Sequence, residues 1–331
     1  MRFTRIILTL LVGASLTGCK STQVQTAAPE GRELLTVDFQ QGRILRYKFV
    51  SDRNVHVDWD PENKSPRSRA RADDTMTEKL EMVVSYTPKA VDPFGTTTLE
   101  ARIDSIKATR TGRSGSRGRK DAVEHAVGRT YTVEVGPTGK IEDPNELDTL
   151  IKEIGEKAFR QDARQGRIKE PDMIGDFVVT QWFLWDAVSS IEDPTEGVAE
   201  GQSWKSKLSV PAPMVMRKAR DVTYTLQEIR PGQKGRVAII TSTHTAAESA
   251  PRDWPIPYSG RFQMAGTFGF LSGYKLLELD GKGRNVFNID RGRMQQYDHQ
   301  YQMKLKAFIP LGIDIQPLIT IKQKVSMELL N

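Results

Sequence analysis

The stretch QYDHQYQMKLKA, residues Gln296–Ala307, carries the clearest secondary-structure signal in the chain. Aromatic or aliphatic side chains occupy every second position from Tyr297 to Ala307, and polar or charged side chains fill the positions between them. Because successive side chains of a strand point to opposite faces of its sheet, this alternation predicts a strand with one buried and one solvated face. Burial on one face only is typical of antiparallel sheets.

The same two-residue period recurs in two strand-rich regions, residues 33–142 and 198–331. It is found at residues 45–49, 55–59, 80–86, 97–103, 131–135, 222–226, 237–239 and 319–329. The segment Asp280-Gly281-Lys282-Gly283 has the composition of a tight turn. We therefore expect the chain to reverse there between two strands.

Between these regions, residues 143–197 change to a helical period. Asp143 is placed to cap a helix that begins with Pro144 and carries the acid Glu146 in its first turn. Apolar residues keep helical spacing again from about residue 171 to residue 190, with Gln181 on the same stripe. The sequence thus predicts an α+β fold, predominantly antiparallel β, in which a helical segment separates two strand-rich halves.

The two halves share a local pattern. Gly128-Arg129 and Gly283-Arg284 each open a strand that is followed by a turn and a second glycine-led segment. One interpretation is a diverged duplication of the strand-rich half. The other is chance, because glycine-led hairpins recur in any β-rich chain.

The N-terminus has the features of a secretory signal. Two arginines precede an apolar segment, residues 6–16, that is too short to span a bilayer as a helix. This segment runs into Leu16-Thr17-Gly18-Cys19, which resembles the lipobox of bacterial lipoproteins. In that family signal peptidase II cleaves before the cysteine, which then carries acyl chains. The resemblance implies a signal peptide over residues 1–18 and lipidation at Cys19.

Residues 19–32 are small and polar, as expected of a flexible tether between a lipid anchor and a folded body. Several acyl chains together hold a protein at a membrane. Lys20 follows the cysteine, whereas lipoproteins retained at the inner membrane of many bacteria carry aspartate there, so the resemblance implies an outer-membrane anchor facing the periplasm. The layout of residues 33–330 also resembles uncharacterised cell-envelope lipoproteins of a domain-of-unknown-function family, and that family brings no activity with it.

Composition argues against several kinds of chemistry. The chain has 331 residues, a formal net charge of +6, four histidines and one cysteine, which excludes an intrachain disulfide and a thiolate zinc site. The histidines are far apart in sequence, and neither a Gly-x-Ser-x-Gly elbow nor a phosphate-binding Gly-x-x-x-x-Gly-Lys-Ser/Thr loop occurs. We therefore expect no cofactor, no metal, no catalytic residues and no enzymatic activity.

Two basic clusters interrupt the first strand-rich half. The functional interpretation is contact with an anionic envelope lipid or polymer, and the alternative is solvated loops. Nucleic acid is disfavoured as a partner by the secreted location. The clusters comprise Lys64, Arg67, Arg69 and Arg71, and then Arg110, Arg113, Arg117, Arg119 and Lys120.

An apolar row at strand spacing suggests a further role. A curved sheet that encloses an apolar groove would line it with such side chains, although rows of this kind also form ordinary core. The function expected is a non-enzymatic, membrane-anchored binding or assembly protein of the envelope. The alternatives are a periplasmic carrier of an apolar or lipid ligand and a hydrolase acting on envelope polymers. The candidate lining residues are Phe262, Met264, Phe268, Phe270 and Met303.

Overall fold

The computed structural model describes most of the chain beyond its N-terminus. The predicted lipobox and Cys19 lie outside the described residues. The described ranges are 29–62, 74–111, 120–158, 167–168, 173–208, 210–212, 215–248, 263–264, 271–309 and 315–330.

A single twelve-stranded antiparallel sheet dominates these residues, as the alternating patterns predict. A separate pair of two-residue strands, β6 and β11, is parallel. The strands are β1 Leu45–Asp58, β2 Asp74–Val91, β3 Thr97–Thr111, β4 Thr130–Val135, β5 Ile141–Asp143, β6 Arg167–Ile168, β7 Ser203–Lys205, β8 Val210–Ala212, β9 Val215–Gly232, β10 Gly235–Ala246, β11 Gln263–Met264, β12 Ser272–Asn288, β13 Arg293–Phe308 and β14 Leu318–Leu329. The helices are the 3₁₀ helix η2 Ala122–Ala126 and the α-helices α1 Asn145–Ala158, α2 Ile174–Trp182 and α3 Asp186–Ser189.

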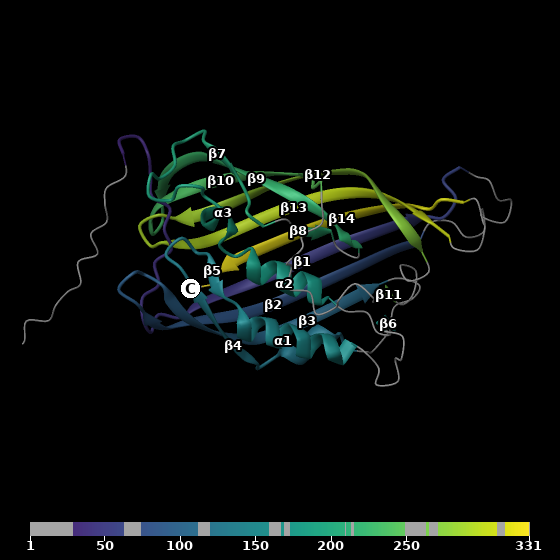
Figure 1. Ribbon diagram of the computed structural model, residues 1–331, viewed down its shortest axis with the longest axis horizontal. Coiled ribbons are helices and arrows are strands. Elements are labelled where there is room, and N and C mark those ends of the chain that lie inside the picture. Colours follow the sequence, from purple (N-terminus) through teal and green to yellow (C-terminus); the bar gives the residue numbers. More distant parts are fainter. Residues whose placement is uncertain are drawn as a thin grey trace, which may run out of the picture.

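The sheet joins the two strand-rich halves. Its strand order is β5-β4-β3-β2-β1-β14-β13-β12-β10-β9-β7, with β8 also paired to β9. Each half is a meander, and β1 pairs with β14, so that Phe49 lies opposite Met327. The helical segment separates the halves in sequence but not in space, because α1, α2 and α3 lie over one face of the shared sheet (Figure 1). The duplication stays a prediction.

The turn expected at Asp280–Gly283 does not form. These residues lie inside β12, where Asp280 pairs with Thr245 of β10 and Gly283 pairs with His299 of β13. A Cβ atom on Gly283 would lie 2.5 Å from His299 Cδ2. The glycines therefore make room for large side chains on the neighbouring strand. A close approach of this kind is one of the reasons for which glycine occurs inside a strand.

The helices of residues 143–197 begin close to the predicted start, but the second predicted helix is divided into two shorter ones. The helix α1 begins at Asn145, one residue later than predicted, and the carboxylate of Asp143 accepts a hydrogen bond from the backbone N–H of that first residue at 2.9 Å. The single helix expected over residues 171–190 is two helices, α2 and α3, interrupted at residues 183–185. The interruption places the Trp185 ring edge-on to Phe39 and Tyr86, at centroid distances of 5.6 and 5.8 Å. Among the described residues, no helix is long and apolar enough to cross a membrane.

Candidate functional site

The helix-facing side of the sheet divides into three zones along the strands. At one end lies a helix-covered cluster, in which Tyr47, Phe49 and Tyr86 of the sheet pack with Phe177 and Trp185 of the helical segment. At the other end lies a strand-end cluster, and none of the described helices contributes a buried side chain to it. This strand-end cluster consists of Val55, Val57, Leu271, Met303, Leu305, Ala307, Ile319 and Ile321.

Between the two apolar clusters lies a polar belt. Its side chains come from β1, β2, β3, β9, β10, β12, β13 and β14, from α2 and from Asp121 at the start of η2, so residues far apart in sequence meet there. Most of them are buried. The belt consists of Ser51, Arg53, Glu78, Arg110, Asp121, Asp176, Arg220, Ser242, His244, Asn285, His299, Tyr301 and Gln323.

One half of the belt is a chain of alternating charges. Arg53 pairs with Asp176 (Nη1 to Oδ2, 3.1 Å) and with Glu78 (Nη2 to Oε2, 2.5 Å). Arg110 pairs with Glu78 (Nε to Oε1, 2.9 Å) and with Asp121 (Nη2 to Oδ2, 2.5 Å). Burial acts to raise the pKa of Glu78, but the two guanidinium groups outweigh it and hold that pKa below its usual range. Each buried charge in this half therefore has an opposite charge beside it.

Gln323 connects this charged half to β13. Its amide nitrogen donates hydrogen bonds to Asp176 Oδ1 at 2.6 Å and to Ser51 Oγ at 2.7 Å. Its amide oxygen accepts a hydrogen bond from the Tyr301 hydroxyl. Buried polar networks of this kind fix one arrangement of a core when their members are satisfied. The start of α2 is thereby tied to the middle of the sheet.

The other half of the belt is basic and aromatic. The Arg220 guanidinium carbon lies 4.0 Å from the centroid of the Tyr301 ring, a cation–π contact. The His244 and His299 rings lie edge to face with centroids 5.3 Å apart. Burial, reinforced by the Arg220 charge, lowers the pKa of His244 to about 2 and that of His299 to about 3. Both imidazoles are therefore neutral at neutral pH.

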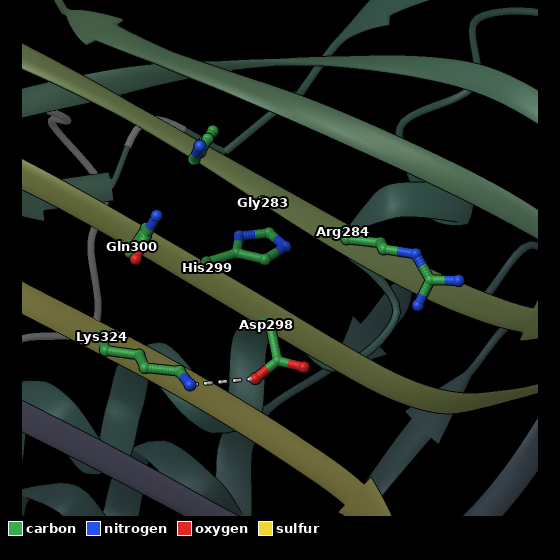
Figure 2. Close-up of a pocket in the computed structure, with 7 residues that line it drawn as sticks. Gly283, Arg284, Asp298, His299, Gln300 and Lys324 are labelled. Carbon is green, nitrogen blue, oxygen red and sulfur yellow. Dashed lines mark ion pairs between the residues drawn. The ribbon is translucent and has the colours of Figure 1, made fainter.

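A shallow depression of about 250 Å³ lies on the sheet at β12, β13 and β14 (Figure 2). Lys324 Nζ lies 3.7 Å from Asp298 Oδ1 across it. Its lining is polar, and it meets the belt only at His299. Among the described residues, no group of three or more His, Cys, Asp or Glu side chains is arranged to hold a metal ion. The lining residues are Lys282, Gly283, Arg284, Asp298, His299, Gln300 and Lys324.

The structure describes three of the fourteen predicted lining and surface-contact residues with their side chains. Met303 is fully buried in the strand-end cluster. Arg110 is largely buried and ion-paired within the belt, so its charge is engaged inside the protein, whereas Lys120 is exposed. Met264 lies in β11. The others, Lys64, Arg67, Arg69, Arg71, Arg113, Arg117, Arg119, Phe262, Phe268 and Phe270, lie outside the described residues.

The sequence predictions do not include most of the belt residues, although the alternating pattern of β1 contains a signal for two of them. Ser51 and Arg53 continue the same alternating phase as Tyr47 and Phe49, and this phase faces the core. A charged residue at an inward position of an alternating strand predicts a buried ion pair or a binding group. The partner Asp176 lies on a helix, so the pairing itself is visible only in three dimensions.

Comparisons with known proteins give no family assignment. No protein-family model matches the chain, and no curated protein matches it. A solved structure titled "Lipid-protein interactions in lipovitellin" aligns with a TM-score of 0.41 at 10% identity, over 87% of this chain and 25% of that one. An outer membrane channel from Pseudomonas putida F1 aligns with a TM-score of 0.17 at 8% identity, over 90% of this chain and 98% of that one. At these TM-scores neither likeness establishes a shared fold.

Proposed function

We propose that the protein is a non-catalytic, lipid-anchored protein of the bacterial cell envelope that carries an apolar ligand at its strand-end cluster. One observation carries the proposal: the same face of one sheet has two apolar clusters, and the described helices contribute to only one of them. At the helix-covered cluster the side chains of α1, α2 and α3 supply a lasting contact for the apolar side chains of the sheet. The strand-end residues are themselves buried, with Met303 and Leu305 at 0% exposure, so an apolar ligand would enter by moving side chains at the edge of the cluster.

The edge of β12 supplies a route to this cluster. Pairing of β12 with β10 ends at Asp280, and the preceding residues 272–279 pair only with β13 among the described strands. Along this free edge the partly buried Leu276 and Leu279 pack against the strand-end cluster, and Leu277 is 45% exposed. An apolar ligand would therefore reach Met303, which lies opposite Leu279, from the side of the sheet.

The belt gives the hydrolase alternative no support. Its buried carboxylates, Asp176, Glu78 and Asp121, are ion-paired to Arg53 or Arg110. A glycoside hydrolase needs one carboxyl group that is held protonated and a second that is free to act as a base or nucleophile. These three acids instead join strands to one another and to the helical elements.

Ligand carriage is tested with the mature protein purified from its host. Native mass spectrometry should show bound lipid, and the neutral fluorescent probe N-phenylnaphthylamine should bind with enhanced emission. Leu276→Glu places a charge on the free edge and should weaken probe binding about tenfold or more, since a charge in an apolar contact is expensive.

Lys275→Glu is the matched control, because Lys275 is the exposed neighbour on the same strand. Its probe binding should equal that of the wild type. Absence of both bound lipid and probe binding would overturn the proposed function. An affinity that Leu276→Glu leaves unchanged would remove the strand-end cluster as its site.

The anchor is tested separately. Cys19→Ser removes the only sulfur that can be acylated in the lipobox. This variant should lose metabolic labelling with palmitate and leave the membrane fraction. A Cys19→Ser protein that stays labelled and membrane-bound would show that the anchor is wrong, without affecting the proposal on ligand carriage.

A further inference from the structure

Arg220 stands apart from the other buried cations of the polar belt. Arg53 and Arg110 are each paired with two carboxylates. Arg220 is only 4% exposed, and within the described part of the chain no carboxylate forms an ion pair with it. Its Nε atom also has no hydrogen-bond partner there. A buried cation without an anion is costly, so the site is suited to an anion supplied from outside.

The nearest buried acids are committed elsewhere. Asp176 is held by Arg53 and Gln323. Asp186 of α3 accepts hydrogen bonds from the Tyr224 hydroxyl at 2.7 Å and from Ser190 and Ser206. Both carboxylates thus have hydrogen-bond or ion-pair partners other than Arg220. The guanidinium of Arg220 contacts the ring of Tyr301 instead.

Glycine lets the neighbouring side chains pack closely over β12 near this guanidinium: a Cβ atom at Gly281 would lie 2.5 Å from Tyr301 Cβ. In the sheet register Gly281 of β12 lies between Tyr301 of β13 and His244 of β10, so the middle strand contributes no side chain to that row. In the next row Gly283 lies between His299 and Ser242. The polar groups in and beside these rows are the Arg220 cation, two imidazoles and the Ser242 hydroxyl. His299 Nε2 is engaged with Asn285 Oδ1 at 3.0 Å, whereas Arg220 Nε and His244 Nδ1 have no partner among the described residues and are the groups suited to an anion.

The anion site and the apolar site lie on one strand. Tyr301 and Met303 are successive inward residues of β13, so they are about 7 Å apart along the strand. Beyond Met303 the inward residues Leu305 and Ala307 are fully buried and apolar. The inner face of β13 is therefore polar at one end and apolar at the other, as the two parts of an amphiphile are.

We propose that Arg220 binds the anionic head group of an amphiphile whose hydrocarbon chain lies along the strand-end cluster. This inference rests on the proposed carriage of an apolar ligand and names the class of that ligand. A fatty-acid carboxylate and a phospholipid phosphate share the chemistry that a guanidinium recognises, namely a negative charge with paired oxygen acceptors.

The test is a competition assay with the full mature protein. Palmitate, phosphatidic acid and the neutral alcohol hexadecanol are each titrated against bound N-phenylnaphthylamine, and the concentration that displaces the probe is measured. In the wild type at least one anionic amphiphile should displace the probe at a concentration about tenfold lower than hexadecanol, as a charge-assisted hydrogen bond predicts. The carboxylate and phosphate arms show which head group is preferred.

Arg220→Met should abolish this preference and still bind the neutral probe, whereas Arg220→Lys should keep part of it. Arg230→Met is the matched control, because Arg230 is an exposed arginine on the same strand, β9, and its removal should leave the preference intact.

Three results separate the two proposals. Equal displacement by anionic and neutral amphiphiles in the wild type overturns the anion site, even when no Arg220 variant folds. A preference that survives in Arg220→Met also overturns it. Failure of every compound to bind the wild type, the neutral probe included, overturns the proposed function and the anion site together.

Discussion

The helix-covered cluster and the strand-end cluster are built from the same strands and differ in what closes them. At the first, Phe177 and Trp185 of the helical segment pack onto Tyr47 and Tyr86 of the sheet. At the second, the described contributors are strand residues and Leu271. Both clusters consist of buried hydrophobic residues, with aromatic rings in the first and aliphatic side chains and Met303 in the second. The difference therefore lies in the partner, which is the protein's own helices in one place and, we propose, a ligand in the other.

The polar belt keeps the two clusters distinct. Its Asp176 ties the first turn of α2 to Ser51, Arg53 and Gln323, where the helix-covered cluster ends. An apolar residue at these positions would extend one cluster into the other. Replacing a buried ion pair with well-packed apolar residues often leaves stability unchanged or raises it, so the expected role of these pairs is to keep the two clusters apart.

The largest expected changes in the free energy of unfolding come from side-chain truncations, which we compare on the two sides of the belt. Trp185→Ala should lower the free energy of unfolding by about 3–5 kcal/mol, because a fully packed ring leaves a cavity. This loss should be the same with and without an anionic amphiphile. Met303→Ala should lose more in its presence, because the variant also binds the ligand less well. Chemical denaturation with and without palmitate measures both, and equal ligand dependence of the two variants would contradict the comparison.

Breaking the belt should have an effect of similar size. Arg53→Met leaves Asp176 without its buried partner and should cost about 3–5 kcal/mol. Lys89→Met removes an exposed pair with Glu100 and serves as control, with an expected change below about 1 kcal/mol. Urea denaturation gives both values. A loss in Arg53→Met no greater than in the control would show that the belt is dispensable.

Acid should weaken the basic half of the belt before the charged half. The pKa values of His244 and His299 are lowered from 6.5 to about 2 and about 3. Their contribution to stability is thus complete above pH 6.5 and is lost as pH falls from there toward the folded-state values. Between pH 6.5 and 5 the loss is about 2 kcal/mol per histidine.

Stability measured against pH in the wild type and in a His244→Gln/His299→Gln double variant tests this expectation. Asp186, whose pKa is raised by burial, changes stability in the opposite sense and is present in both proteins. The slope between pH 6.5 and 5 should be smaller in the double variant. An unchanged slope would mean that the two imidazoles do not titrate as buried groups.

The smallest effect concerns the glycines of β12. A Cβ atom at Gly283 would lie 2.5 Å from both His299 Cδ2 and Ser242 Oγ. Gly283→Ala should therefore cost about 1–3 kcal/mol through overpacking. Gly201→Ala is a useful contrast, since nothing lies within 4 Å of that Cβ position and only its positive φ of 83° opposes the change. Thermal unfolding of both variants measures the two costs, and a stable Gly283→Ala protein would contradict the close approach.

The sequence predicts the strands and the cap well and the belt poorly. The alternation at Tyr297–Ala307 identifies β13 because one face is buried along its whole length, and the Asp143 cap depends only on local spacing. The turn that the sequence predicts near Asp280 is wrong, because glycine is typical both of turns and of strand positions that a neighbouring side chain approaches closely. The sequence places Arg110 in a basic cluster expected to contact an anionic surface. Its ion pairs are not visible there, because Glu78 lies 32 residues away and Asp121 follows the cluster without a spacing that marks it as a partner.

Hydrogen–deuterium exchange tests the central claim, that the two ends of one sheet face have different partners, most directly. It is measured on the mature protein with and without a saturating anionic amphiphile. Slower exchange should be confined to residues 272–281 of β12 and 301–307 of β13, while α1, α2 and α3 exchange as before. Equal protection of the helical segment, or no protection at either strand, would contradict the claim.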